Sequence, residues 1–225
     1  MTETLKSFAK LSPRLQIVAD LVPQCRRLLD IGTDHAWLPI ELLRQGRCSE
    51  AVAIDIRPGP LAIARRNIQA SGLSDRITVR LADGLDELPL STEDTIVMAG
   101  LGGNEMIHIL EMQPRSAKAI ILQPMKSLPE LRIWLCANGY RIETEKLAIE
   151  EHRSYVILRC RPTENPITIS LLESLIGPVL IKEQPPGFSI YLKSLLTHLS
   201  KSSHGKPELA EMINQIRQLV KEGRE

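Results

Sequence analysis

The feature that most constrains this chain is a series of short, continuously apolar runs separated by helical segments. The runs lie at residues 27–31, 51–56, 77–81, 95–99 and 119–122. Such strands are buried on both faces, because a strand with one face in water alternates apolar and polar residues. Strands that alternate with helices form a parallel sheet covered by helices on both sides. The sequence therefore predicts an α/β fold with a doubly wound sheet.

Other segments extend this prediction. Ser12 and Pro13 are typical of a helix N-cap and first turn, so a helix is expected up to the neighbourhood of Pro23. Further helices are expected after Gly32, over 60–72, after Gly103 and over 128–138. The runs 140–147 and 154–160 lie so close in sequence that we expect them to pair antiparallel.

The pattern changes after Pro162. Helical segments are expected over 167–181, 187–203 and 207–222, separated by stretches that contain proline and glycine. We therefore divide the chain into an α/β domain over residues 1–161 and a small helical domain over 162–225. A coiled coil is one arrangement open to the helices of this second domain.

Charge and cysteine content limit the classes of protein that fit. The 225-residue chain has a net charge of +1, so binding to RNA would need a local basic patch. Its cysteines are isolated, with no Cys-x-x-Cys pair and no partner histidine at zinc spacing: Cys25, Cys48, Cys136 and Cys160. We interpret them as reduced, mostly buried thiols of a cytoplasmic protein.

Targeting signals are also missing from the sequence. The first ten residues lack the apolar stretch of a secretory signal, and no run approaches the roughly 18–20 apolar residues that span a membrane. We expect no membrane attachment, no metal and a monomer.

The candidate site lies where the predicted strands end, because ligands of an open parallel sheet bind beyond the carboxyl ends of its strands. The first strand runs into Asp30-Ile31-Gly32-Thr33-Asp34-His35. Gly32 permits a sharp turn and a close ligand. Dinucleotide loops carry two further glycines, because a pyrophosphate lies on bare backbone at the helix N-terminus. Here those glycines are absent and Asp34 would repel a phosphate, so the loop suits a ligand with a positive charge. S-adenosylmethionine carries both a sulfonium and an ammonium group.

The later strand ends support the same ligand. Asp55 can accept hydrogen bonds from the two hydroxyls of a ribose, and Asp83, followed by Gly84, can accept from the amine of adenine. Gly100 and Gly102 follow the fourth strand and form a floor where substrate and methyl donor can meet. Each residue has a simpler interpretation, as a helix cap or a tight turn. The coincidence of all of them at the correct strand ends favours the cofactor site.

The motifs that carry these residues resemble those of one family. The chain contains D-I-G-T-D-H-A-W-L-P-I, D-x-R-x-G-P-L, V-R-L-A-D-G-L, M-A-G-L-G-G, L-Q-P-M and L-R-x-W-L, in this order, across roughly residues 11–160. This series is similar to that of the bacterial tRNA (adenine(22)-N1)-methyltransferases. The resemblance implies a Rossmann-like class I methyltransferase fold, S-adenosylmethionine as cofactor and tRNA as substrate. It also implies that residues 162–225 form the helical, tRNA-contacting domain.

Methylation of adenine N1 requires alignment and charge stabilisation rather than a strong base, because neutral adenine already carries a lone pair there. The base must leave the RNA stack and lie against an aromatic or apolar face. We expect Trp37 to provide this face, His35 to contact the base or the methionine group, Gln123 to bond the base edge and Tyr155 to line its pocket. Core packing or a loop hydrogen bond is the alternative for each. Lys126, Arg132 and Arg153 are expected beside this face, where RNA phosphates would bind.

Two residues depart from the usual form of the family. Trp37 stands where tyrosine is usual and keeps an aromatic face, whereas Met125 stands where asparagine is usual and removes an amide near the base pocket. One alternative is a class I methyltransferase that acts on a small molecule or a protein, which the modest net charge favours. Another is a non-catalytic module that binds S-adenosylmethionine or RNA. The missing glycines disfavour a nicotinamide dehydrogenase.

Overall fold

The structure is a computed structural model that describes residues 10–86, 88–112, 116–151, 153–202 and 207–222. The outermost residues of both predicted domains, 1–9 and 223–225, therefore lie outside the described part. The strands are β1 (Cys25–Ile31), β2 (Cys48–Asp55), β3 (Ile77–Leu81), β4 (Asp94–Ala99), β5 (Ala119–Gln123), β6 (Tyr140–Glu150) and β7 (Arg153–Pro162). The helices are α1 (Pro13–Leu21), α2 (Trp37–Arg44), α3 (Pro58–Ser71), α4 (Gly103–Glu111), α5 (Leu128–Ala137), α6 (Leu171–Ile176), α7 (Pro178–Glu183), α8 (Phe188–Ser202) and α9 (Pro207–Glu222).

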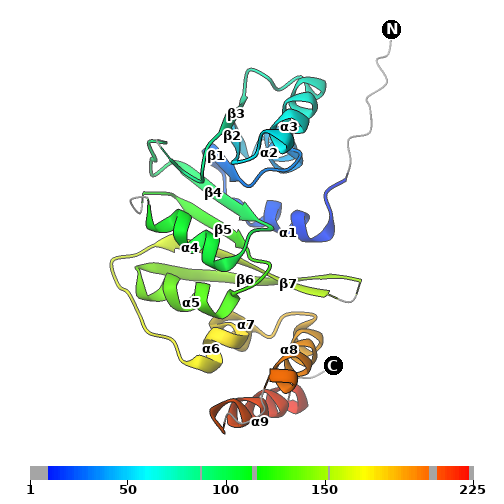
Figure 1. Cartoon of the computed structure of the whole chain (residues 1–225), viewed down its shortest axis with the longest axis vertical. Coiled ribbons are helices and arrows are strands. Elements are labelled where there is room, and N and C mark those ends of the chain that lie inside the picture. Colours follow the sequence, from blue (N-terminus) through cyan, green and yellow to red (C-terminus); the bar gives the residue numbers. More distant parts are fainter. Residues whose placement is uncertain (1–9, 87, 113–115, 152, 203–206, 223–225) are drawn as a thin grey trace.

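The strands form one seven-stranded sheet in the order β3-β2-β1-β4-β5-β7-β6 (Figure 1). The first five are parallel, and β7 pairs antiparallel with both β5 and β6. The predicted α/β fold and the predicted antiparallel pair are thus confirmed. The strand order reverses direction at β1, which lies between β2 and β4, so this is the switch point at which a ligand is expected.

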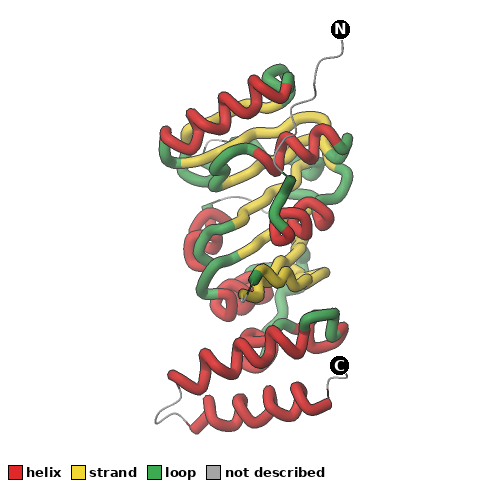
Figure 2. The backbone as a smooth tube through the Cα atoms, turned by 90° about the vertical axis from the view of Figure 1, so that its right-hand side faces the viewer, coloured by secondary structure: helices red, strands yellow, loops and turns green. Residues whose placement is uncertain are grey.

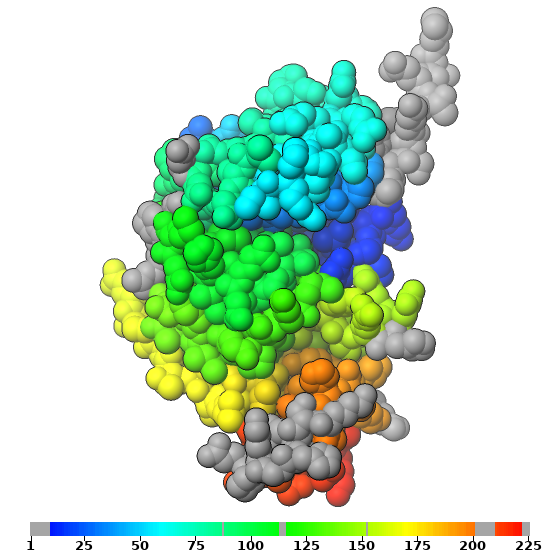
Figure 3. Space-filling model, in the orientation of Figure 1, coloured from blue at the N-terminus to red at the C-terminus, as the bar shows by residue number. Residues whose placement is uncertain are grey.

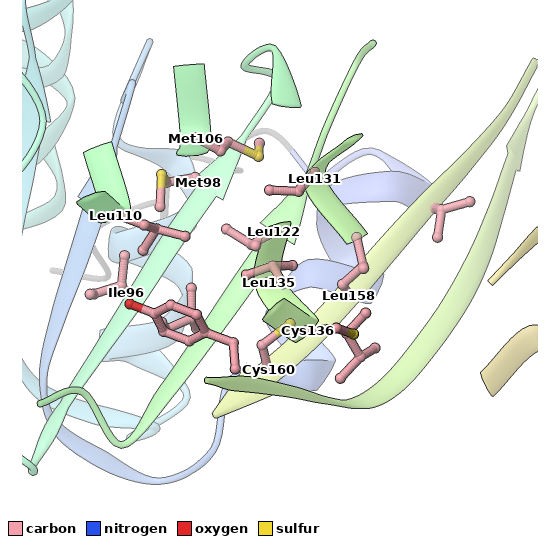
Figure 4. Packing of buried hydrophobic residues seen from close by; sticks show 14 of the residues in the cluster. Ile96, Met98, Met106, Leu110, Leu122, Leu131, Leu135, Cys136, Leu158 and Cys160 are labelled. Atoms are coloured by element: carbon pink, nitrogen blue, oxygen red, sulfur yellow. The ribbon is translucent and has the colours of Figure 1, made fainter. Parts of the chain in front are cut away.

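Helices cover both faces of the sheet (Figure 2). Leu28 of β1 packs in a cluster with residues of α1, α2 and α3, whereas its neighbour Leu29 packs in a cluster with residues of α4 and α5. Figure 4 shows part of the second cluster, with Leu131 of α5 facing Leu122 of β5. Because adjacent residues of a strand point to opposite faces, both must be apolar here, which explains the continuous apolar runs.

The C-terminal helices lie at one end of the molecule (Figure 3). Helices α8 and α9 pack side by side as a hairpin (Figure 2). Leu192 of α8 and Ile216 of α9 are fully buried and belong to the same core cluster as α4 and α5. The apolar core therefore continues from the sheet into the helical segment.

One helix prediction was wrong. The expected helix over 167–181 consists of two short helices, α6 and α7, which break at Gly177. Gly177 has φ 116°, and a Cβ there would lie 2.5 Å from Glu145 Oε2 and 2.6 Å from Arg132 Nη2. A side chain is excluded at this position, and Pro178 begins the next helix because it needs no N–H donor there.

Arg132 also lies elsewhere than predicted. We expected it to contact RNA beside the active face, but its side chain is fully buried in an ion pair with Glu145, which is equally buried. Within the described residues, all four cysteines are free and buried, as we predicted.

Candidate active site

Two cavities share Gly32 in their walls, at the carboxyl ends of β1 and β2. The Asp55 cavity has a volume of about 370 Å³ and is lined by Ile31, Gly32, Asp55, Ile56, Arg57, Ala82, Asp83, Gly84, Leu101, Glu105 and Ile109. The Asp30 cavity has a volume of about 180 Å³ and is lined by Arg14, Leu15, Asp30, Gly32, Thr33, Asp34, His35, Ala36, Trp37, Leu38 and Ala99. Most of the predicted cofactor residues thus surround two adjoining cavities.

Gly32 has φ 75°, a conformation that favours glycine, and a Cβ there would lie 2.9 Å from Leu101 Cδ2. Its N–H donates to the carbonyl of Ile54 at 2.8 Å, so the turn is fixed to β2. The backbone at Gly32 is therefore bare and held in place between the two cavities.

The Asp55 cavity holds two carboxylates. Asp55 is buried, and its Oδ1 accepts from the backbone N–H of Arg57 at 2.7 Å. Its Oδ2 accepts no hydrogen bond from the described residues. Asp83 lines the same cavity and is exposed. Arg57 Nε also lies 3.4 Å from Asp55 Oδ1, so Asp55 Oδ2 and the Asp83 carboxylate are the acceptors left for hydroxyl or amine groups of a ligand.

The Asp30 cavity is also acidic. Asp30 is 7% exposed, and burial raises its pKa to about 6, with the Thr33 side chain opposing the rise and the Asp55 charge adding to it. Asp34 is exposed and lies 3.0 Å from His35 Nε2. A positively charged ligand group in this cavity would favour ionised Asp30 and remove part of the cost of its burial.

Trp37 lines the Asp30 cavity and not the larger Tyr155 cavity described below. Its ring is 6.4 Å from that of His35, measured between centroids, at an interplanar angle of 23°. The structure thus brings His35 and Trp37 together beside Asp30, whereas we expected Trp37 to provide the face against which the base lies.

The glycines after β4 join two strand-end loops. Gly100 N–H donates to the Gln123 carbonyl at 3.0 Å, Met125 N–H to the Leu101 carbonyl at 2.8 Å, and Gly103 N–H to the Lys126 carbonyl at 2.9 Å. A Cβ at Gly103 would lie 2.3 Å from the Ser127 carbonyl oxygen. Ala99 and Leu101 line the two cavities, so the glycines shape the floor through the backbone.

A third and larger hollow, the Tyr155 cavity, has a volume of about 620 Å³. It lies between the loop after β5, the start of β7 and helix α8, and is lined by Pro124, Met125, Lys126, Ser127, Leu128, Pro129, Glu130, Arg153, Ser154, Tyr155, Val156, Leu175, Tyr191, Ser194, Leu195, His198 and Leu199. Tyr155, Lys126 and Arg153 therefore line one cavity. The cavity also has a wall from the C-terminal helices.

Gln123 is fully buried beneath the loop after β5. Its Nε2 donates to the Pro124 carbonyl at 3.0 Å, and its Oε1 accepts from Arg14 Nη1, also at 3.0 Å. Both ends of the amide have protein partners, so Gln123 holds the loop and the arginine in a fixed relation.

Arg14 is a residue that we did not predict to line the cofactor cavities. Its Nη1 also lies 3.4 Å from Met125 Sδ, and its guanidinium carbon lies 5.1 Å from the centroid of the Tyr155 ring. Arg14 lines the Asp30 cavity, whereas Met125 and Tyr155 line the Tyr155 cavity. The sequence placed Arg14 on the first helix but contained no signal for the face it occupies.

Comparisons with known proteins agree with this geometry. The profile of a methyltransferase domain matches residues 11–158. A Bacillus subtilis (strain 168) protein, tRNA (adenine(22)-N(1))-methyltransferase, is 33% identical over 95% of this chain and 92% of its own length. The chain belongs to the tRNA (adenine(22)-N1)-methyltransferase family.

Solved structures of this methyltransferase family share the fold. A candidate tRNA (m1A22) methyltransferase of Streptococcus pneumoniae, solved with S-adenosyl-L-methionine, has a TM-score of 0.85 and 33% identity, covering 94% of this chain and all (100%) of that one. TrmK of M. capricolum, solved with the natural cofactor product S-adenosyl-homocysteine, has a TM-score of 0.82 and 27% identity, covering 96% of this chain and 100% of that one.

The described residues of this methyltransferase contain no group of three or more histidine, cysteine or acidic side chains that would hold a metal ion. Among the helices that the structure describes, none is both long and apolar enough to cross a membrane. The acidic side chains that line the two adjoining cavities fit S-adenosylmethionine, whose sulfonium and ammonium are cationic and whose ribose and adenine donate hydrogen bonds.

Proposed function

We propose that this protein transfers a methyl group from S-adenosylmethionine to N1 of adenine 22 in tRNA. The observation that carries the proposal is the pair of acidic cavities that share Gly32. Arg14 lines one of them and contacts Met125 in the wall of the Tyr155 cavity, so the cavities are neighbours. This arrangement provides one place for a cationic nucleoside and a separate place for an acceptor. The B. subtilis relative is named for this reaction, and the streptococcal relative was solved with this cofactor.

Each strand end takes one part of the cofactor. Asp55 accepts from the ribose hydroxyls and Asp83 from the adenine amine, in the cavity that they share. Asp30, Asp34 and His35 surround the methionine group. The bare backbone at Gly32 lets the cofactor pass between the two cavities.

When bound, the cofactor supplies an electrophilic methyl group, which the adenine N1 lone pair takes up while the carbon–sulfur bond electrons move to sulfur. The protein needs no general base for this reaction. Its own residues align the acceptor: Gln123 fixes the loop after β5, and the ring of Tyr155 lines the cavity that would receive the base. The apolar part of that cavity excludes water from the base.

The tRNA is held by the larger cavity and by the C-terminal helices. Lys126 and Arg153 are exposed at the Tyr155 cavity, where they can pair with phosphates next to the displaced base. Helix α8 closes the same cavity, so residues 162–225 act as a tRNA-contacting domain. With tRNA as the proposed substrate, we expect the protein in the cytoplasm.

The test uses purified protein, labelled S-adenosylmethionine and an unmodified tRNA transcript with adenine at position 22. We expect the label in 1-methyladenosine after digestion, and none in a matched transcript with guanine at that position. Label in another nucleoside, or no label in tRNA while the cofactor still binds, contradicts the proposal. In that case the alternative acceptors, small molecules and proteins, are tested with the same label.

A further inference from the structure

One donor of the Arg14 guanidinium is buried and has no hydrogen-bond partner among the described residues. Its Nη1 is bonded to Gln123 Oε1, but its Nε is buried and makes no hydrogen bond with any described residue. The backbone N–H of Arg14 donates to Glu150 Oε1 at 2.7 Å, which fixes the start of α1. A buried donor on a charged group is costly when it has no partner, so a ligand acceptor is expected beside it.

The charges around the Asp30 cavity indicate what that acceptor is. Its acidic groups are Asp30 and Asp34, and Arg14 is the only lysine or arginine among the described residues that line it. The amino-acid end of a ligand carries an ammonium and a carboxylate together. The acids match the ammonium, and the guanidinium matches the carboxylate.

We propose that Arg14 binds the carboxylate of the cofactor's methionine group and, through the same guanidinium, positions Gln123 at the acceptor side. The inference rests on the cofactor assigned under the proposed function. It makes Arg14 a cofactor-binding residue and also a positioning residue, because its Nη1 holds the Gln123 amide and the Met125 sulfur. The two cavities then share one charged group.

The first test compares the binding of S-adenosylmethionine with that of its decarboxylated analogue, which keeps the sulfonium and the amine. By calorimetry we expect the wild type to bind the cofactor roughly 10- to 100-fold more tightly than the analogue, as for a charged hydrogen bond. Arg14→Met should lose this preference by weakening only the cofactor. Arg14→Lys should restore part of it, since an ammonium is a point charge without the planar fork.

The matched control is Arg65→Met, an exposed arginine on α3 that lines neither cofactor cavity. It should keep the wild-type preference. A wild type that shows no preference, or an Arg14→Met protein that keeps it or weakens both ligands equally, overturns the inference. The wild-type comparison decides the matter even if Arg14→Met fails to fold. A wild type that binds neither ligand contradicts the cofactor assignment itself, and the inference with it.

The positioning role has a separate readout. At saturating cofactor, Arg14→Lys should lower kcat for tRNA while its KM stays close to that of the wild type, because the lysine cannot hold both Gln123 and Met125. An unchanged kcat, or a change confined to KM, excludes the positioning role.

Discussion

Arg132 of α5 and Glu145 of β6 form a fully buried ion pair. The Nη atoms of the arginine cap the end of one helix, and Oε2 of the glutamate caps the start of the next. Arg132 Nε lies 2.8 Å from Glu145 Oε1, while its Nη atoms donate to the carbonyls of Ser174, Leu175 and Ile176 at the end of α6. Glu145 Oε2 accepts from the N–H groups of Val179 and Leu180 at the start of α7. The pair therefore fixes the C-terminal helices to the sheet at the break between α6 and α7.

Removing one partner of this pair should be strongly destabilising. Glu145→Ala leaves a buried guanidinium without a counter-charge, and we expect a loss of about 3–5 kcal/mol in the free energy of unfolding. Urea unfolding followed by circular dichroism measures it. The control is the next residue, Lys146→Ala, whose exposed pair with Glu183 at 3.5 Å should contribute less than about 1 kcal/mol. Equal losses for the two variants would contradict the structural role of the buried pair.

Asp30 should make the stability of the cofactor-free protein depend on pH. Its folded pKa of about 6 lies above the ordinary 3.8, so the folded state holds the proton more tightly than the unfolded state. The stability from this group is complete below the unfolded pKa and is lost as the pH rises through 6. Asp30→Asn should therefore raise the melting temperature at about pH 7.5 and not at about pH 4. A gain that is equal at both values would exclude Asp30 as the cause.

The same group should make cofactor binding sensitive to acid. A cationic ligand favours the ionised carboxylate, so the apparent Kd of S-adenosylmethionine should rise about tenfold for each pH unit below the Asp30 pKa. Titration calorimetry between about pH 5 and 8 measures this dependence, and the Asp30→Asn protein, which lacks the titrating carboxyl, is the control. A wild-type Kd that is constant across this range would contradict the prediction.

Gly103 should not tolerate a side chain. In Gly103→Ala the new Cβ would meet the Ser127 carbonyl, a backbone atom that cannot move away, and would separate the two loops. We expect the free energy of unfolding to fall by at least about 2 kcal/mol, as measured by urea unfolding. We also expect methyl-transfer activity to be lost. Gly59→Ala in α3 is the matched control, since a Cβ there meets nothing within 4 Å. Similar stability of the two variants would show that the loops are not joined as described.

Met125→Asn, which restores the usual residue of the family, should have a small effect. The Met125 side chain is 47% exposed, so stability should change by less than about 0.5 kcal/mol. The asparagine oxygen can accept from Arg14 as the sulfur does, so cofactor affinity should be preserved. Steady-state kinetics with tRNA measures the effect of the substitution on kcat and KM for the acceptor. A loss of cofactor binding would contradict the position assigned to this side chain at the acceptor cavity.

The parts of the structure that follow from local patterns were predictable. Apolar runs located the strands, and the strand ends placed Asp30 and Asp55 in adjoining cavities. Contacts between distant residues were not predictable. Arginine is usually a surface residue, so burial of Arg132 was not expected. The carbonyl groups that make its burial possible lie 42–44 residues further along the chain. The break at Gly177 and the contact of Arg14 with Gln123, 109 residues away, arise from the same kind of long-range packing.

The backbone hydrogen bonds between the loops after β4 and β5 have a consequence for how such enzymes diverge. The position of the second loop is fixed by the N–H and carbonyl groups of Gly100, Leu101, Gly103, Gln123, Met125 and Lys126, none of which depends on the side chain at 125. That position can therefore change by mutation while the loop stays in place. A lineage can alter the rim of its acceptor cavity by single substitutions there, without first evolving a new loop conformation.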